Sequence, residues 1–173
     1  LKEQGDLNAA IASYNKALEL KPYFPDAHNN LGLALREQGD LNDAIASYNK
    51  AIEIKPYFPD AHNNLGLALR EQGDLKAAIA SYKKALELKP NFPDAHNNLG
   101  NALKEQGNLN VAIASFNQAI QLKSNYPEAH NNLGNALHEQ GDLNAAIASF
   151  NQATQLKSNY PEAHNNLGLA LQE

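Results

Sequence analysis

Five histidines recur at intervals of 34 residues, and imidazole is a common metal ligand, so a metal-binding row must be considered first. The row consists of His28, His62, His96, His130 and His164. Successive copies would lie on separate helices, whose axes pack at least about 8–10 Å apart. One shared ion requires bonds of about 2 Å to every ring, which favours partly buried packing histidines over ligands. His138 stands outside the row and is expected at the surface.

The other residues with reactive side chains form no catalytic arrangement. Carboxylates such as Glu37 and Asp40 repeat at predicted helix ends and turns, where solvation and capping explain them. The glycines are not clustered as in a phosphate-binding loop, and Ser47 lies mid-helix with no distinctive base beside it. Cysteine is absent. We therefore expect no enzyme activity, no cofactor and no metal.

The same period organises the whole chain. The phrase that begins Pro25-Asp26-Ala27-His28 returns every 34 residues, which is typical of stacked repeats in which each unit packs mainly on its neighbours. We predict a single array of four full repeats flanked by two partial ones. Its parts are residues 1–24 (partial), 25–58, 59–92, 93–126 and 127–160 (full), and 161–173 (partial). The chain opens within a repeat and without Met, so we expect a fragment of a longer protein.

Each full repeat predicts two antiparallel helices. Counting positions from the proline that begins a repeat, Pro25 suits the first helical position and Gly39 suits a left-handed helix end. Asp40 can cap the second helix, which should run from about Leu41 to Ile54 and end before Pro56. Apolar residues at positions 3, 7, 10 and 11, and again in the second helix, predict the packed faces. A small residue at Gly32 would let the two helices approach closely, so a bulky replacement should cost about 1–3 kcal/mol.

The composition of the chain disfavours two classes of partner. With a net charge of −5, the chain has no excess of positive charge with which to attract nucleic acid or an anionic membrane. No apolar run approaches the roughly 20 residues of a membrane span, and no signal peptide is visible. From these absences we expect a cytoplasmic protein whose partner is a protein or peptide.

The face of the first helix opposite its apolar side carries rows of polar residues. Asparagine is a mediocre helix former, and its carboxamide both donates and accepts hydrogen bonds, as an extended backbone requires. An open alternative is that recent duplication copied residues that only confer solubility. The rows are Asn29, Asn63, Asn97, Asn131 and Asn165 at position 5, Asn30, Asn64, Asn98, Asn132 and Asn166 at position 6, and Asn101 and Asn135 at position 9.

The pattern of Leu31, Gly32, Ala44, Tyr48, Ala51 and Pro56 resembles the tetratricopeptide repeat, and it recurs along the whole chain. This resemblance implies an all-α, right-handed superhelical α-solenoid of antiparallel helix pairs, with the first helices lining a concave groove. The repeated Asn-Asn-Leu-Gly also resembles the repeat arm of O-linked N-acetylglucosamine transferases and related bacterial arrays. That likeness implies a position-6 asparagine ladder that grips peptide main chain. The histidine at position 4 and the serines at Ser124 and Ser158, where proline is usual, depart from the family pattern.

These observations predict a protein–protein interaction scaffold that binds an extended peptide through the asparagine rows. Family members that clamp acidic C-terminal tails use basic residues at positions 2, 5 and 6, which this chain lacks, so that ligand is disfavoured. Two alternatives remain. The chain could be the substrate-selecting arm of a larger glycosyltransferase, or a self-assembling array whose two partial repeats associate head to tail.

Overall fold

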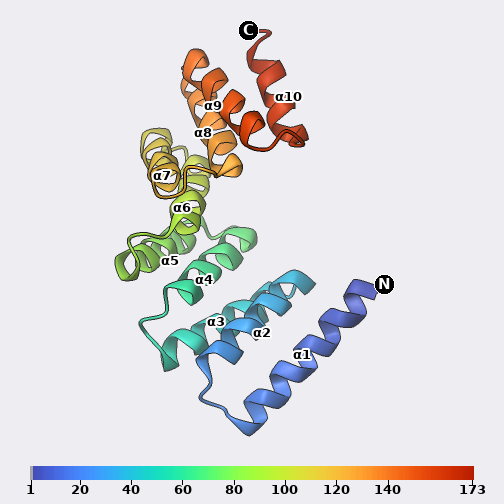
Figure 1. Cartoon of the computed structure of the whole chain (residues 1–173). Helices are drawn as coiled ribbons and strands as arrows, with labels where there is room; N and C mark the ends of the chain where they lie inside the picture. The colour runs from blue at the N-terminus through green and yellow to red at the C-terminus, as the bar shows by residue number, and fades with distance from the viewer. Residues whose placement is uncertain (1) are drawn as a thin grey trace. The chain divides into compact units, whose positions relative to one another are not determined.

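The computed structural model describes residues 2–173, with side chains from residue 6 onward. Over residues 2–173 the chain forms ten α-helices and no strand, so the predicted all-α class is confirmed (Figure 1). The helices are α1 (Lys2–Leu20), α2 (Pro25–Gln38), α3 (Leu41–Ile54), α4 (Pro59–Gln72), α5 (Leu75–Leu88), α6 (Pro93–Glu105), α7 (Leu109–Leu122), α8 (Pro127–Gln140), α9 (Leu143–Leu156) and α10 (Pro161–Ala170).

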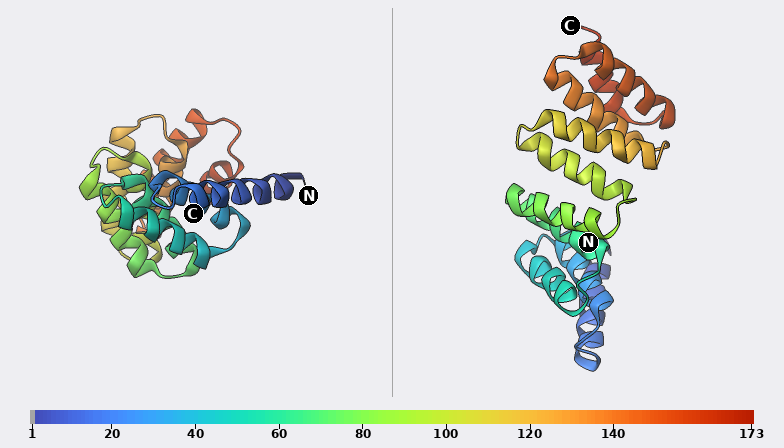
Figure 2. Two further views of the ribbon diagram at one scale, coloured as in Figure 1. Left: turned by 90° about the horizontal axis from the view of Figure 1, so that it is seen from below. Right: turned by 90° about the vertical axis from the view of Figure 1, so that its left-hand side faces the viewer.

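The helices fall into two compact units that divide between Pro90 and Asn91. Unit 1 contains α1 to α5, in which α2 packs on α3 and α4 on α5, while α1 packs on α2 and α3 on α4. Unit 2 contains α6 to α10 and repeats this scheme, with α6 on α7, α8 on α9, α7 on α8 and α9 on α10. Within each unit, consecutive helices lie side by side and run in opposite directions, as the short connections predict (Figures 1 and 2).

The helix boundaries follow from proline and glycine chemistry. Every first helix of a repeat begins at its proline, where the missing N–H costs nothing. Gly39 ends α2 with φ of 93°, and the next N–H, from Asp40, donates to Leu35 O at 2.9 Å. The second helices end at the predicted place even where serine replaces proline, because α7 and α9 stop at Leu122 and Leu156 just as α3 stops at Ile54. The proline is therefore not what ends these helices.

Two local expectations need correction. Asp74 and Asp142 accept hydrogen bonds from Ala77 N and Ala145 N, as helix caps should. The side chain of Asp40 makes no such bond, so the capping prediction is wrong there.

The second correction concerns the start of the chain, where the sequence predicts a helix end at Gly5, as at Gly39. Instead α1 is continuous from Lys2 through Gly5, although Gln4-Gly5-Asp6 matches Gln38-Gly39-Asp40. In the full repeats, the helix before the glycine packs along the helix after it, and this packing favours the turn. No more than three described residues precede Gly5, which is too few to form such a helix.

The core of each repeat is one aromatic ring packed on one glycine. Tyr48, Tyr82, Phe116 and Phe150 are the largest fully buried side chains. A Cβ atom at Gly66 would lie 2.6 Å from Cε1 of Tyr82, closer than any real contact. Glycine is therefore needed for the two helix axes to approach, as the sequence indicated. At Gly168, in the partial last repeat, a Cβ atom would meet nothing within 4 Å.

This difference gives a matched pair of substitutions. We expect Gly66→Ala to lower the free energy of unfolding by about 1–3 kcal/mol, because the Tyr82 ring must shift. Gly168→Ala should be neutral or stabilising by up to about 1 kcal/mol, since alanine favours helix and the space is open. Urea denaturation followed by circular dichroism measures both. Equal losses from the two variants would contradict the ring-on-glycine account.

Candidate functional site

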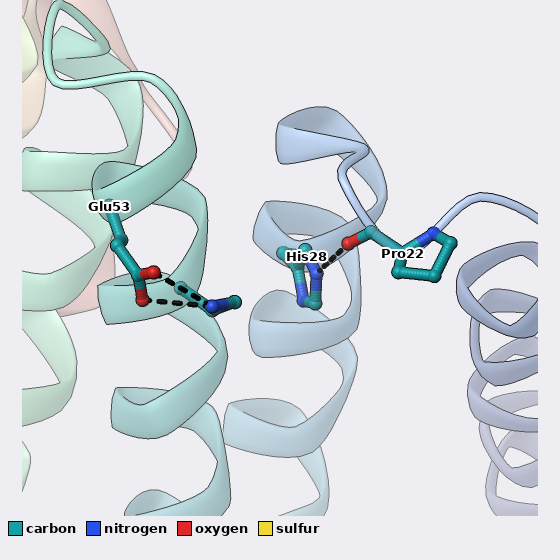
Figure 3. Close-up of polar contacts among 4 residues, drawn as sticks. Pro22, His28 and Glu53 are labelled. Atoms are coloured by element: carbon teal, nitrogen blue, oxygen red, sulfur yellow. Dashed lines mark hydrogen bonds and ion pairs between the residues drawn. The ribbon is translucent and has the colours of Figure 1, made fainter.

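The histidine row fastens the loops that connect repeats. The Nε2–H of His28 donates to the carbonyl oxygen of Pro22 at 2.9 Å (Figure 3). His62 makes the same bond to Pro56 at 3.2 Å, and His164 makes it to Ser158 at 3.0 Å. Because the acceptor is a backbone carbonyl, proline and serine serve equally well.

No metal site emerges from these histidines. Among the side chains from residue 6 onward, no group of three or more His, Asp or Glu residues is placed to hold a metal ion. The side chains near the row have other partners, such as the Glu53 carboxylate, which accepts from Lys50 Nζ at 2.9 Å (Figure 3). What the histidine arrangement can do chemically is to hold one loop against the following helix.

The asparagine rows form a network of side-chain hydrogen bonds between successive repeats. In unit 1, Nδ2 of Asn64 donates to Oδ1 of Asn29 at 3.0 Å. In unit 2, Asn132 donates to Asn97, and Asn166 to Asn131, at the same distance. Each bond therefore joins the position-6 amide of one repeat to the position-5 amide of the repeat before it.

The two rows differ in burial. Four of the position-5 side chains are buried, with exposed fractions of 6–7%, in Asn29, Asn63, Asn97 and Asn131, whereas Asn165 in the partial last repeat is exposed. The position-6 side chains are half-buried in Asn30, Asn64, Asn98, Asn132 and Asn166, as are Asn101 and Asn135 at position 9. Each bond described above uses one N–H of a position-6 amide and leaves its second N–H and its carbonyl oxygen for other contacts.

Hollows open beside these residues in each unit. In unit 2, a hollow of about 160 Å³ brings Asn135 and Asn166 together with His138, Phe150 and Leu169. In unit 1, a second hollow of about 260 Å³ is lined by residues of α1 and by Asn30, Leu33 and Glu37. Both lie on the predicted polar face of the first helices. Leu33 and Leu169 make the floor partly apolar.

Ion pairs between repeats border this face, and the sequence analysis missed them. Arg36 Nε lies 3.8 Å from Glu71 Oε1, and Lys104 Nζ lies 3.8 Å from Glu139 Oε2. His138 Nε2 lies 3.2 Å from an oxygen of Glu173. In every pair, position 12 meets position 13 of the next repeat, so the common spacing of 35 residues was a usable signal. The carboxylates of these pairs are about half exposed or more, so each pair stabilises by at most about 1 kcal/mol and mainly orients the side chains.

The acidic row at position 2 differs between the units. In unit 2, Asp94 accepts a hydrogen bond from Tyr126 Oη at 2.9 Å, and burial together with this bond raises the pKa of Tyr126. Lys157 Nζ lies 3.5 Å from Glu128. In unit 1, Asp26 is exposed, and position 34 of its repeat is Phe58, which has no hydroxyl to donate.

The helix pairs and the repeated polar face together are those of a helical-repeat protein. A family model described as TPR repeat matches residues 1–39, 32–73, 66–107, 100–141 and 134–173. The chain belongs to this family, as the sequence resemblance predicted.

Solved structures with the same fold cover most of the chain. MamA is 27% identical with a TM-score of 0.81, over 91% of this chain and 92% of that one. A thermophilic TPR protein of Thermus thermophilus, TTC0263, is 23% identical with a TM-score of 0.79, over 100% and 94%. YrrB, described as a TPR protein with an unusual peptide-binding site, is 23% identical with a TM-score of 0.76, over 95% and 85%. The comparison with curated proteins found no match.

Family and fold support a protein-interaction scaffold, and TPR-repeat proteins are generally not catalytic. No helix within residues 2–173 is long and apolar enough to cross a membrane. The narrower resemblance to glycosyltransferase repeat arms stays a prediction.

The histidines give a prediction about pH. Burial lowers the pKa of His62 and His130 below the usual value, although the backbone carbonyl bond opposes the change. The unfolded chain therefore binds protons more readily than the folded one as the pH falls below about 6.5. The free energy of unfolding should decrease from about pH 7 to pH 5.5 and change little above pH 7 from this cause. NMR titration should place both pKa values below those of the same histidines in urea. Values equal to those in urea would refute the assignment.

Proposed function

We propose that the chain binds an extended peptide through the position-6 asparagines, which contact the peptide main chain. The observation that supports this proposal is the hydrogen bond between the position-6 asparagine of one repeat and the position-5 asparagine of the repeat before it. Asn132 is held by its bond to the buried Asn97, so its amide is oriented before any ligand arrives. An oriented amide loses less conformational entropy on binding than a mobile one.

The chemistry of a carboxamide fits a peptide backbone. The second N–H of each position-6 amide can donate to a peptide carbonyl, and its carbonyl oxygen can accept from a peptide N–H. Asn135 and Asn166 line one hollow together and could contact neighbouring peptide groups. Because every main chain offers these groups, the asparagines would provide affinity, and side chains such as Leu33 and Leu169 would provide selectivity.

The relatives support a ligand of this kind. YrrB is described as having a peptide-binding site, and its similarity to this chain extends over nearly all of the fold. A substrate-selecting arm of a larger glycosyltransferase would use the same peptide contacts, so one binding experiment bears on both ideas.

The experiment begins with a displayed library of random 12-residue peptides, selected on the 173-residue chain. The selected peptide is then tested against the variant Asn64→Ala/Asn98→Ala/Asn132→Ala. We expect affinity to fall more than tenfold, which is about 1.4 kcal/mol. Isothermal titration calorimetry measures this affinity. The titration is done at a low temperature at which circular dichroism shows that the variant keeps the helix content of the wild type.

The matched control removes three exposed asparagines from the second helices, by Asn49→Ala/Asn117→Ala/Asn151→Ala. This variant should bind with unchanged affinity. Asn135→Ala gives a further test, because Asn135 lines the hollow. This substitution disturbs the asparagine pairs less than the triple variant does. If a peptide binds the chain and the position-6 triple variant keeps its full affinity, the asparagine proposal fails.

A specific observation favours self-association as a second activity of the 173-residue chain. Gly168 lacks the aromatic ring that covers its counterpart in every full repeat, and Leu169 and Leu171 are more than half exposed. Tyr14 occupies the ring position on α1 and is half-buried, whereas Tyr48 is fully buried. We propose that Tyr14 of one copy packs on Gly168 of another, which repeats the contact found inside each full repeat.

This contact joins different patches and leads to open chains of molecules. Light scattering over a concentration series should show a rising average mass, and Leu171→Glu, at a side chain 64% exposed, should abolish the rise. Leu20→Glu, which adds charge at a side chain 78% exposed, is the control and should leave it unchanged. A wild-type chain that stays monomeric at millimolar concentration would exclude the contact.

A further inference from the structure

Tyr48 has a buried hydroxyl that the packing of the repeat does not explain. Its ring lies against Gly32, where a Cβ atom would be 2.9 Å from Tyr48 Cζ. The residue is 0% exposed. Within the part of the chain that the structure describes, Tyr48 Oη makes no hydrogen bond. An unpartnered buried donor of this kind costs about 1–3 kcal/mol, so its presence calls for an explanation.

A second donor without a partner lies beside it. Arg36 follows Gly32 by one turn on α2, so its side chain projects from the same side of the helix as the Tyr48 ring. Arg36 Nε faces Glu71 at 3.8 Å, but Nη1 is buried and makes no hydrogen bond to any described group. The charge of Arg36 acts on the pKa of Tyr48, so the two buried donors lie near each other, and neither has an acceptor among the described residues.

The charges around this place indicate which acceptor fits. Burial raises the pKa of Tyr48 to about 12, with Arg36 opposing the change and Glu71 and Glu37 adding to it. The hydroxyl therefore keeps its proton at neutral pH. Two carboxylates nearby would repel an anionic ligand atom. A neutral oxygen that only accepts hydrogen bonds is the ligand atom that matches.

Unit 2 builds the same position without these donors. Phe116 and Phe150 replace the tyrosine, and Lys104 and His138 replace the arginine. Phe116 lies against Gly100 at the same distances as Tyr48 against Gly32, so the hydroxyl is not needed for packing. The equivalent positions Phe150 and His138 line the hollow that also contains Asn166. The position of Tyr48 therefore corresponds to one that borders a hollow in unit 2, and Tyr48 itself is fully buried.

We propose that Tyr48 Oη and Arg36 Nη1 together bind one main-chain carbonyl oxygen of a peptide on the unit 1 face. This inference rests on the proposed peptide-binding function and adds a fixed point to it. The asparagines repeat and would accept a peptide in several registers. The same two residue types occur in both full repeats of unit 1, as Tyr48 with Arg36 and as Tyr82 with Arg70, and they are absent from the phenylalanine repeats. The site would therefore limit the peptide to registers that place a carbonyl oxygen in unit 1.

The first test is Tyr48→Phe, measured with the library-selected peptide. We expect affinity to fall roughly five- to tenfold, as for loss of one buried hydrogen bond. The thermal midpoint of the free protein should stay unchanged or rise, because the substitution removes an unpartnered hydroxyl. The control Tyr57→Phe removes a hydroxyl from a side chain that is 80% exposed and should leave affinity unchanged. Unchanged affinity for Tyr48→Phe would overturn the site.

The second test identifies the peptide atom. Each amide of the peptide is replaced in turn by an ester, whose carbonyl is a weaker acceptor. One ester should weaken binding to the wild-type chain and have a much smaller effect on Tyr48→Phe. A scan in which every ester affects both proteins equally would overturn the proposal, as would a peptide-bound crystal structure with a water molecule between Tyr48 Oη and Arg36 Nη1.

These outcomes separate the site from the function on which it rests. If the position-6 asparagine triple variant loses affinity while Tyr48→Phe does not, the peptide-binding function stands and the carbonyl site falls. If no peptide can be selected on the chain, both fall together. If Tyr48→Phe loses affinity and the asparagine variant does not, peptide binding stands, the carbonyl site survives and the asparagine ladder falls.

Discussion

The contact between an aromatic ring and a glycine sets the geometry of each repeat. The rings of Tyr48, Tyr82, Phe116 and Phe150 lie where a glycine Cβ would otherwise be, at distances near 2.6 Å. No other residue leaves this space, so the two helices of a pair approach only because the first carries a glycine. The small residues Ala44 and Ala51, both fully buried, pack against residues of the next helix, α4. The position of every polar side chain on the opposite face follows from this spacing.

Close packing gives two adjacent asparagines different roles. Asn29 turns toward the next repeat and is buried, where a carboxamide is tolerated only with hydrogen-bond partners, and Asn64 supplies one. Asn64 is thereby oriented, with one N–H and its carbonyl oxygen left over. The buried amide is structural, and the half-buried amide is the one that can reach a ligand. A peptide bound as proposed would meet amides that are already oriented, which is the condition for an affinity that does not depend on a large apolar area.

The sequence was sufficient for features that depend on local chemistry and period. The limits Leu41–Ile54 and the left-handed glycines at Gly39, Gly73 and Gly141 follow from one repeat read alone. The sequence was insufficient where packing against a neighbouring element determines the burial of a side chain or the end of a helix. Asn29 and Asn30 are adjacent in sequence, and periodicity assigns both to one face, but only the packed next repeat shows which is buried. Gly5 and Gly39 share their neighbours in sequence, yet one lies within a helix and the other ends one. The repeat pattern shows that tyrosine and arginine occur together in unit 1 and not in unit 2, but only the structure shows that the hydroxyl of Tyr48 and Nη1 of Arg36 are buried without partners among the described residues.

Near-identical repeats can still differ in binding chemistry, because a hydroxyl group can be present or absent at one position without a change in the packing. Tyrosine in place of phenylalanine at position 24 keeps the ring on its glycine and adds only a hydroxyl. The reverse exchange occurs at position 34, where Phe58 of unit 1 corresponds to Tyr126 of unit 2, and the added hydroxyl binds Asp94. Among the described residues, unit 1 therefore has an unpartnered hydroxyl at Tyr48 and only a phenylalanine, Phe58, opposite Asp26. Unit 2 has no hydroxyl at Phe116 and has one that binds Asp94. Packing therefore constrains the rings, whereas a hydroxyl can be present or absent without a change in the contact between ring and glycine.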